Sequence, residues 1–158
     1  MRILSTILTV AAALSVASPA NAGPAEDATT AVTSVLDKFN AGDFKAFAEA
    51  HRDGALIIDE FPPYHWGGSG SVKQWGADYE KDAAARGITA GRVDYGAPLQ
   101  AHSNGGSAYI VLPTSYSFQQ KGAKMVGKGS MTFVMARDGS AWKIASWTYS
   151  GATPVAEK

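Results

Sequence analysis

The chain contains no cysteine, which excludes disulfide bridges, thiolate metal ligands and cysteine-based redox chemistry. Histidine is scarce, and the three present, taken with Asp59 and Glu60, match no metal-binding spacing, so we expect neither a metal nor another cofactor. Charged residues are few, Lys+Arg and Asp+Glu balance at 14 each, and no basic cluster occurs. This composition excludes a nucleic-acid-binding surface.

A long uncharged run occurs only at the start of the chain. Arg2 precedes an uncharged, mostly apolar stretch over residues 3–16, and Ala20-Asn21-Ala22 follows with the small-residue pattern of a cleavage site. We therefore expect residues 1–22 to be a signal peptide that is cleaved between Ala22 and Gly23. The protein would then be exported, either to a periplasm or out of the cell.

The alternative for this segment is a membrane anchor. Pro19 and Asn21 interrupt the apolar run, whereas a membrane span needs roughly 20 continuous apolar residues. We therefore expect no membrane attachment after cleavage. Residues 23–158 have the length of a single domain with its own core.

Helices are expected in the first half of the domain. Apolar residues recur at three- and four-residue steps over 26–39, which predicts an amphipathic helix that Asn40-Ala41-Gly42 ends. Asp43 is placed to cap a second, short helix. A third helix is expected from Ser69 or Ser71 to Arg86, where Gly87 stops it.

Strands and turns fill most of the rest. We expect a turn at 51–54 and an irregular aromatic loop at 61–68, and strands over residues 55–60, 88–103, 107–119, 124–136 and 141–150. Because helices come first and hairpins second, the predicted class is α+β, with three N-terminal helices packed on one face of a mostly antiparallel sheet.

Two hairpin turns set the expected register of the sheet. Two-residue turns at Lys121-Gly122 and Asp138-Gly139 would pair Gln120 with Ala123 and Arg137 with Ser140. Large apolar residues then gather on one face, toward the helices: Ala108, Ile110, Leu112, Met131, Phe133, Met135, Trp142 and Ile144. A slip of one residue would turn them all outward, so this agreement supports the register.

The same face becomes small and polar toward its other end. Thr114, Tyr116, Ser146 and Thr148 lie there in this register, together with the glycines at 127 and 129. Glycine has no side chain, so we expect an open, partly polar cavity above the sheet. The alternative is that the glycines only relieve crowding under Tyr116.

The opposite face would carry Tyr109, Trp147 and Tyr149. Large aromatic residues exposed together are unusual for a monomer, so we expect a second copy of the chain to cover this face as a homodimer.

The order of these segments resembles a known superfamily. The features that carry the resemblance are, in order, a helix, Asn40-Ala41-Gly42-Asp43, a second helix, the strand 55–59, an aromatic loop ending at Gly67-Gly68, a third helix and hairpins ending at 142–146. This order is similar to the SnoaL-like, nuclear-transport-factor-2-like superfamily. The resemblance implies a cystatin-like cone, in which a strongly curved sheet wraps three helices around a pocket. Members include isomerases, cyclases, dehydratases and proteins that only bind, so the fold does not give the function.

The steroid-isomerase branch can be compared residue by residue. Its general base falls on Asp59, but its two oxyanion donors, a tyrosine and a protonated acid, fall on Val35 and Met131. Neither of these can donate a hydrogen bond, so steroid-type isomerisation is not expected.

Asp59, at a strand end beside the expected cavity, is the candidate base, and His65 in the loop is its candidate proton-carrying partner. Asp59 can equally be a turn or capping carboxylate, and His65 an exposed loop residue. The expected ligand-binding residues are Tyr64, Trp66, Trp75, Tyr79, Leu112, Thr114, Tyr116, Met131, Ser146 and Thr148. The aromatic members can instead be ordinary core.

Three functions stay open at this point. The first is a binding domain that holds a small, partly apolar molecule without turnover. The second is a lyase, cyclase or isomerase that uses Asp59 and His65 as acid and base, with Tyr64, Tyr79 or Tyr116 as a donor. The third is a protein-interaction subunit that works through the outer face of the sheet.

Overall fold

A computed structural model describes residues 23–157, so the predicted signal peptide lies outside the described residues. Three helices precede most of the sheet: α1 (Pro24–Asn40), α2 (Phe44–Glu49) and α3 (Ser71–Arg86). The predicted caps are confirmed, since the Asp43 side chain accepts from the Ala46 amide and Gly87 adopts φ +66°. All three helices therefore begin and end near the residues that the sequence indicates.

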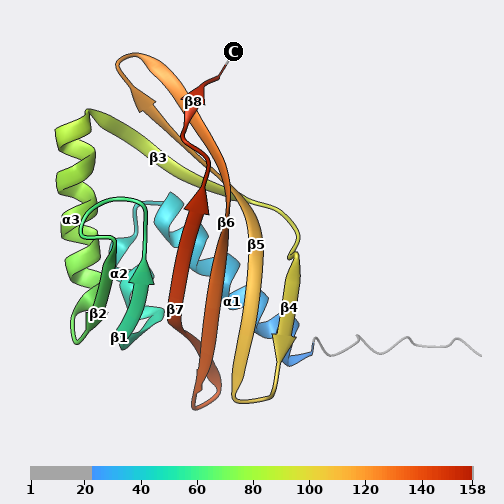
Figure 1. Ribbon diagram of the computed structural model, residues 1–158. Helices are drawn as coiled ribbons and strands as arrows, with labels where there is room; N and C mark the ends of the chain where they lie inside the picture. The colour runs from blue at the N-terminus through green and yellow to red at the C-terminus, as the bar shows by residue number, and fades with distance from the viewer. Residues whose placement is uncertain (1–22, 158) are drawn as a thin grey trace, which may run out of the picture.

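The strands form one mixed sheet that curves around α1 (Figure 1). Its central order is β2-β1-β7-β6-β5-β3. The strands are β1 (His51–Ile58), β2 (His65–Gly68), β3 (Ile88–Tyr95), β4 (Gln100–Ser103), β5 (Ser107–Gln120), β6 (Ala123–Asp138), β7 (Ala141–Gly151) and β8 (Val155–Ala156). β1 and β7 pair in parallel, and the other pairs are antiparallel. The α+β class and the curved cone are confirmed.

Three local predictions were wrong. Residues 51–54 begin β1 instead of forming a turn, because Gly54 at φ +75° lets the strand pass an irregularity in its pairing. The aromatic loop contains β2, which pairs with β1. The expected strand over 88–103 is two strands, β3 and β4, that both pair with β5.

The β5–β6 register is as predicted, from Gln120 opposite Ala123 to Ala108 opposite Met135. The β6–β7 register differs in two ways. The hairpin loop is Gly139-Ser140, so Asp138 pairs with Ala141, and Ala145 is an extra residue between two pairs. The different loop shifts the register by an even number of residues, so each side chain stays on its predicted face of the sheet. The bulge at Ala145 shifts the register by one residue, so the side chains that follow it in β7 change faces.

This bulge reverses the predicted faces at the end of β7. Trp147 and Tyr149 turn toward the helices, and Trp147 is only 3% exposed. Ser146 and Thr148 lie on the outer face, opposite the exposed Leu56 and Ile58 of β1. Two of the three aromatic residues predicted for the homodimer surface, Trp147 and Tyr149, therefore do not lie on the outer face, and only Tyr109 is exposed there.

The core lies between α1 and the middle of the sheet. Val32, Val35 and Leu36 of α1 pack in the same cluster as Ile110, Phe133 and Ile144 of the sheet. Ile110 and Ile144 are fully buried. Burial of a large aliphatic or aromatic side chain contributes about 1.5–3 kcal/mol, so this cluster fixes the sheet on α1 and leaves α3 at one side of it.

The sequence predicted open space above the glycines of β6, and this prediction was wrong. A Cβ on Gly127 would meet the Ala152 carbonyl oxygen at 2.9 Å and Pro154 at 3.1 Å, and one on Gly129 would overlap the backbone of β7. The absent side chains therefore allow the C-terminal segment, residues 152–157, to cross close over β6. No helix among residues 23–157 is long and apolar enough to cross a membrane.

Candidate functional site

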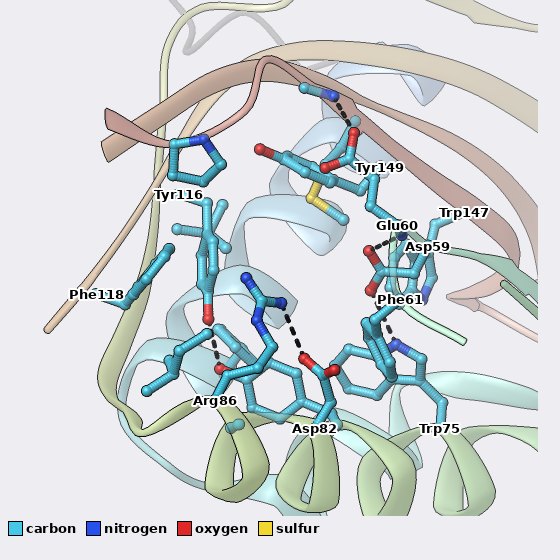
Figure 2. Close-up of a pocket in the computed structure, with 18 of the residues that line it drawn as sticks. Asp59, Glu60, Phe61, Trp75, Asp82, Arg86, Tyr116, Phe118, Trp147 and Tyr149 are labelled. Carbon is cyan, nitrogen blue, oxygen red and sulfur yellow. Dashed lines mark hydrogen bonds and ion pairs between the residues drawn. The ribbon is translucent and has the colours of Figure 1, made fainter. Parts of the chain in front are cut away.

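A cavity of about 320 Å³ lies between α3 and the inner face of the sheet (Figure 2). Twenty-one residues line it, nine of them aromatic. They are Leu36, Phe39, Phe47, Asp59, Glu60, Phe61, Trp75, Tyr79, Asp82, Ala83, Arg86, Ile88, Val93, Tyr116, Phe118, Met131, Trp147, Tyr149, Gly151, Thr153 and Pro154. The C-terminal segment thus closes part of the wall, and the hollow predicted from the sequence exists for a different reason.

Asp59 reaches the cavity because of the alternation of β1. Ala55 and Ile57 face inward and are buried, whereas Leu56 and Ile58 face outward, so the side chain two residues beyond Ile57 faces inward as well. One carboxylate oxygen accepts from the Glu60 amide at 2.8 Å, and the other accepts from the Trp75 indole at 3.0 Å. These two donors fix the orientation of the carboxylate.

Burial raises the pKa of Asp59 to about 6, and the charges of Glu60 and Asp82 act in the same direction. The two hydrogen bonds oppose this shift without cancelling it. The carboxyl group therefore titrates close to neutral pH while it faces a partly open, largely apolar cavity.

Helix α3 supplies one wall of the cavity. Trp75, Tyr79, Asp82 and Arg86 follow three- and four-residue steps and so lie on one face. Asp82 accepts from Arg86 at 2.9 Å, and the Arg86 side chain is 48% exposed. The indole of Trp75 is nearly perpendicular to that of Trp147, with ring centroids 5.2 Å apart. The wall therefore combines aromatic surface with one ion pair.

Two tyrosine hydroxyl groups meet at the far side of the cavity from Asp59 (Figure 2). The Oη atoms of Tyr79 and Tyr116 are 2.8 Å apart. Burial raises the pKa of both phenols, so both stay protonated at neutral pH. Gly91 of β3 makes room for the pair, since a Cβ there would overlap the Tyr79 hydroxyl and lie 2.8 Å from that of Tyr116.

Tyr149 and Glu60 form the wall beneath the C-terminal segment. The Glu60 carboxylate accepts from the Gly151 amide at 2.7 Å, and the Tyr149 ring occupies the space that a side chain at Gly151 would need. Burial, followed by the charges of Glu60 and Asp59, raises the pKa of Tyr149 to about 12. A further hydroxyl donor thus lies on the acidic side of the cavity.

His51 lies outside this wall and has a structural role. Its Nδ1–H donates to the Phe47 carbonyl at 2.8 Å, and its Nε2 accepts from the Trp147 indole at 3.1 Å. These partners require the neutral ring, and burial lowers the pKa of His51 to about 4. The contact ties β1 to β7 directly behind the cavity.

Of the predicted site residues, Asp59, Trp75, Tyr79, Tyr116 and Met131 line the cavity. The others lie elsewhere. His65 pairs with Ile58 on the outer face, so it does not meet Asp59, and Tyr64 is 58% exposed. Trp66, Leu112 and Thr114 are buried outside the cavity wall, and Ser146 and Thr148 face outward because of the bulge.

The sequence reasoning missed several wall residues. Trp147 and Tyr149 were assigned to the wrong face because nothing in the residues around Ala145 indicates a bulge. Glu60, Asp82 and Arg86 carried a usable signal, since the last two fall on the same helix face as Trp75 and Tyr79. Thr153 and Pro154 belong to a stretch that looks like a polar tail.

The two positions compared with the steroid isomerases contain no donor in the structure. Val35 is 4% exposed and lies in the core, and Met131 lines the cavity. Among residues 23–157, no group of three or more His, Cys, Asp or Glu side chains is arranged to hold a metal ion. The polar side-chain groups among the lining residues are carboxylates, tyrosine hydroxyls, the Thr153 hydroxyl, indole N–H groups and one guanidinium.

Comparisons with known proteins agree with this architecture. A family model described as a SnoaL-like domain matches residues 28–155. No curated protein sequence matches the chain.

Several solved structures have a similar fold. A nuclear transport factor 2 (NTF2-like) superfamily protein from Salmonella enterica serovar Typhimurium is 16% identical, with a TM-score of 0.64 over 82% of this chain and 91% of that one. A ketosteroid isomerase-like protein from Erwinia carotovora atroseptica is 14% identical, with a TM-score of 0.63 over 81% and 95%. The protein Aln2 from a Streptomyces species is 14% identical, with a TM-score of 0.61 over 79% and 88%. At these identities the likeness shows the fold alone.

Proposed function

Because the chain belongs to the SnoaL-like domain family, within the NTF2-like superfamily, we propose that it binds a small, partly apolar molecule in the cavity under α3. The observation that carries this proposal is the cavity itself, which has about 320 Å³ of space and walls rich in aromatic side chains. Small-molecule sites have this character: a concave apolar space with a few polar groups that fix orientation. Asp59 and the Tyr79–Tyr116 pair supply such groups at two sides.

Filling the cavity should abolish binding. Ala83 lines the cavity from α3, so Ala83→Trp would place an indole in the space that the ligand needs. Ala85 lies on the same helix, is exposed and does not line the cavity, so Ala85→Trp is the matched control. We expect the neutral fluorescent probe N-phenyl-1-naphthylamine to brighten with the native and Ala85→Trp proteins and not with Ala83→Trp.

Native mass spectrometry of protein purified from its source would show the natural ligand as a bound mass. Equal brightening with all three proteins would place the probe outside the cavity, and no brightening with any of them would leave the cavity without a binding role. Either result would contradict the proposal.

A second candidate is an enzyme that uses Asp59 as a general base. The observation in its favour is a carboxylate that faces the cavity with a pKa of about 6, opposite a pair of protonated tyrosines. His65 takes no part, because it lies on the outer face. This candidate predicts that the protein exchanges the α-protons of an enolisable cyclic ketone in D₂O and that Asp59→Asn stops the exchange. No exchange above the buffer rate with a panel of such ketones would count against it.

Export and dimer formation stay proposals. Residues 1–22 support export, and amino-terminal sequencing of the secreted protein should begin at Gly23. The outer face presents Leu56, Ile58, Tyr109 and Val134, each between 37% and 44% exposed, which supports a homodimer through a surface other than the one first drawn. Light scattering that shows only monomer at micromolar concentration would contradict the homodimer proposal.

A further inference from the structure

The walls of the cavity point to one class of ligand, and we propose that the site takes an organic cation: an ammonium group attached to an apolar, ring-sized body. This inference rests on the proposed binding function and names its ligand class. It is based on the balance of charge around the cavity and on the aromatic surface that faces it.

The charged groups of the wall are predominantly acidic. Asp59, Glu60 and Asp82 contribute three carboxylates, and Arg86 is the one cation among the lining residues. Arg86 is engaged by Asp82 at 2.9 Å at the more exposed edge of the site. The wall therefore keeps a net negative charge, carried by Asp59 and Glu60.

Asp59 lacks the charged partner that a largely buried carboxylate normally has. Its two hydrogen bonds come from a backbone amide and an indole, both of which are neutral. A buried charge is costly unless it is paired, and no basic side chain of the described residues forms an ion pair with Asp59. A cationic ligand would supply the missing charge.

The aromatic wall suits the same ligand. Trp75 and Tyr79 stack with ring centroids 5.4 Å apart, and Trp147, which also lines the cavity, stands nearly perpendicular to Trp75. Indole and phenol rings attract cations through their negative faces, most strongly where water is excluded. An anion would meet the carboxylates, and a neutral hydrocarbon would leave Asp59 unpaired, so a cation fits both features of the wall.

The proposal implies a pH dependence, because a protonated Asp59 cannot pair with a cation. The charged and titratable groups that surround it are Glu60 beside it, Tyr79, Asp82 and Arg86 on α3, Tyr116 on β5 and Tyr149 on β7. The pKa values of the three tyrosines are raised, so they stay neutral across the acidic range. Binding of a cation should weaken below pH 6 as Asp59 takes up its proton.

A matched pair of probes tests charge alone. Benzyltrimethylammonium and neopentylbenzene have the same shape, with a cationic nitrogen in the first replaced by carbon in the second. Displacement of N-phenyl-1-naphthylamine measures their affinities, and phenylacetate serves as the anionic probe. At pH 8 we expect the cation to bind about tenfold or more tightly than its neutral isostere, and the anion to bind most weakly.

Two variants locate the effect. Asp59→Asn should weaken the cation about tenfold or more and change the neutral isostere by less than about threefold. Asp94→Asn is the control, since Asp94 is exposed, pairs with Arg92 and does not line the cavity. If Asp59→Asn does not fold, the native protein gives the same information: its affinity for the cation should fall by the same factor, about tenfold or more in total, as the pH falls below 6, while that for the isostere stays constant.

Equal affinities for the cation and the isostere, or a flat pH profile for the cation, would overturn the proposal. If the fluorescent probe binds and Ala83→Trp prevents it while the cation gains nothing over its isostere, the ligand class is wrong and the binding function stands. If no probe enters the cavity of the native protein, both fail.

Discussion

His51 accepts a hydrogen bond from the Trp147 indole and Asp59 accepts one from the Trp75 indole, and the two residues respond to acid in opposite directions. His51 is held neutral by its two partners and has a pKa of about 4, whereas the histidine of an unfolded chain has a pKa near 6.5. Asp59 has a pKa of about 6 against 3.8 in an unfolded chain. Each group therefore makes stability depend on pH.

The sign follows from which state binds more protons. Between pH 6.5 and 4 the unfolded chain protonates at His51 and the folded protein does not, so the stability that this residue contributes is lost as pH falls. Between pH 6 and 3.8 the folded protein protonates at Asp59 and the unfolded chain does not, so its contribution is gained as pH falls and lost as pH rises through 6. The two effects offset one another in the native protein.

Replacing either residue should expose the effect of the other on the pH dependence of the unfolding free energy. From pH 7.5 to 4.5 we expect the unfolding free energy of His51→Gln to rise by about 2.5 kcal/mol relative to the native protein, and that of Asp59→Asn to fall by about 2 kcal/mol. Urea denaturation at the two pH values measures both. His102→Gln, at an exposed position, should follow the native protein. Parallel pH profiles for all four proteins would mean that neither group is perturbed as described.

At the scale of the element, β3 holds the tyrosine pair in place through its irregular start. The pairing with β5 shifts between Thr89 and Arg92, Ala90 adopts φ +53°, and Gly91 then approaches the two hydroxyls. The irregular pairing of β3 thus lets the backbone at Gly91 lie close to the two tyrosine hydroxyl groups.

Gly91→Ala should separate the two tyrosines. The added methyl group would overlap the Tyr79 hydroxyl, so we expect a loss of about 1–3 kcal/mol of stability and weaker binding of N-phenyl-1-naphthylamine. Gly106→Ala is the matched control, because a Cβ there meets nothing closer than 4.0 Å and the backbone has no positive φ. Thermal unfolding and probe titration measure the two effects. A Gly91→Ala protein as stable and as competent in binding as Gly106→Ala would show that the close approach has no consequence.

The elements also show where sequence reasoning succeeds. Helix limits and the β5–β6 register follow from local signals, such as the Asp43 cap and the turn at Lys121-Gly122, where both residues have positive φ. Asp59 was found because it lies at the end of a predicted strand, where the family resemblance places a general base, and the alternation of β1 in the structure turns it inward. The second half of β7 was not predictable in this way, since the bulge at Ala145 is stabilised by contacts with β1 and α3 that are distant in sequence. One extra residue exchanged the faces of Trp147 and Ser146, and it moved two of the expected site residues, Ser146 and Thr148, to the outer face.

At the scale of the whole molecule, the C-terminal segment completes the cavity. It leaves β7 at Gly151, crosses Gly127 and joins β6 through β8, where Lys124 and Glu157 form an exposed ion pair at 2.7 Å. An exposed ion pair contributes about 0–1 kcal/mol, and both residues of β8 are exposed, so we expect the segment to add little to stability. Its Thr153 and Pro154 nevertheless form part of the cavity wall.

Removal of residues 152–158 should therefore reduce binding more than stability. We expect the shortened protein to keep its circular dichroism spectrum, to unfold within a few degrees of the native protein, and to bind N-phenyl-1-naphthylamine about fivefold more weakly because apolar wall surface is lost. Removal of residues 157–158 alone keeps the wall and is the control. A shortened protein that binds as well as the control would show that the crossing segment is not part of the site.

The tyrosine pair has one more consequence. Two hydroxyl groups hold two hydrogens between them, and the contact between Tyr79 and Tyr116 uses only one. Either ring can be the donor, so the spare hydrogen can sit on either oxygen. A ligand with a single carbonyl or ether oxygen can accept a hydrogen bond either from Tyr79 on α3 or from Tyr116 on β5. Only the two O–H bonds need to rotate, and both rings keep their positions. The wall opposite the carboxylate can thus serve guests that differ in where that oxygen lies.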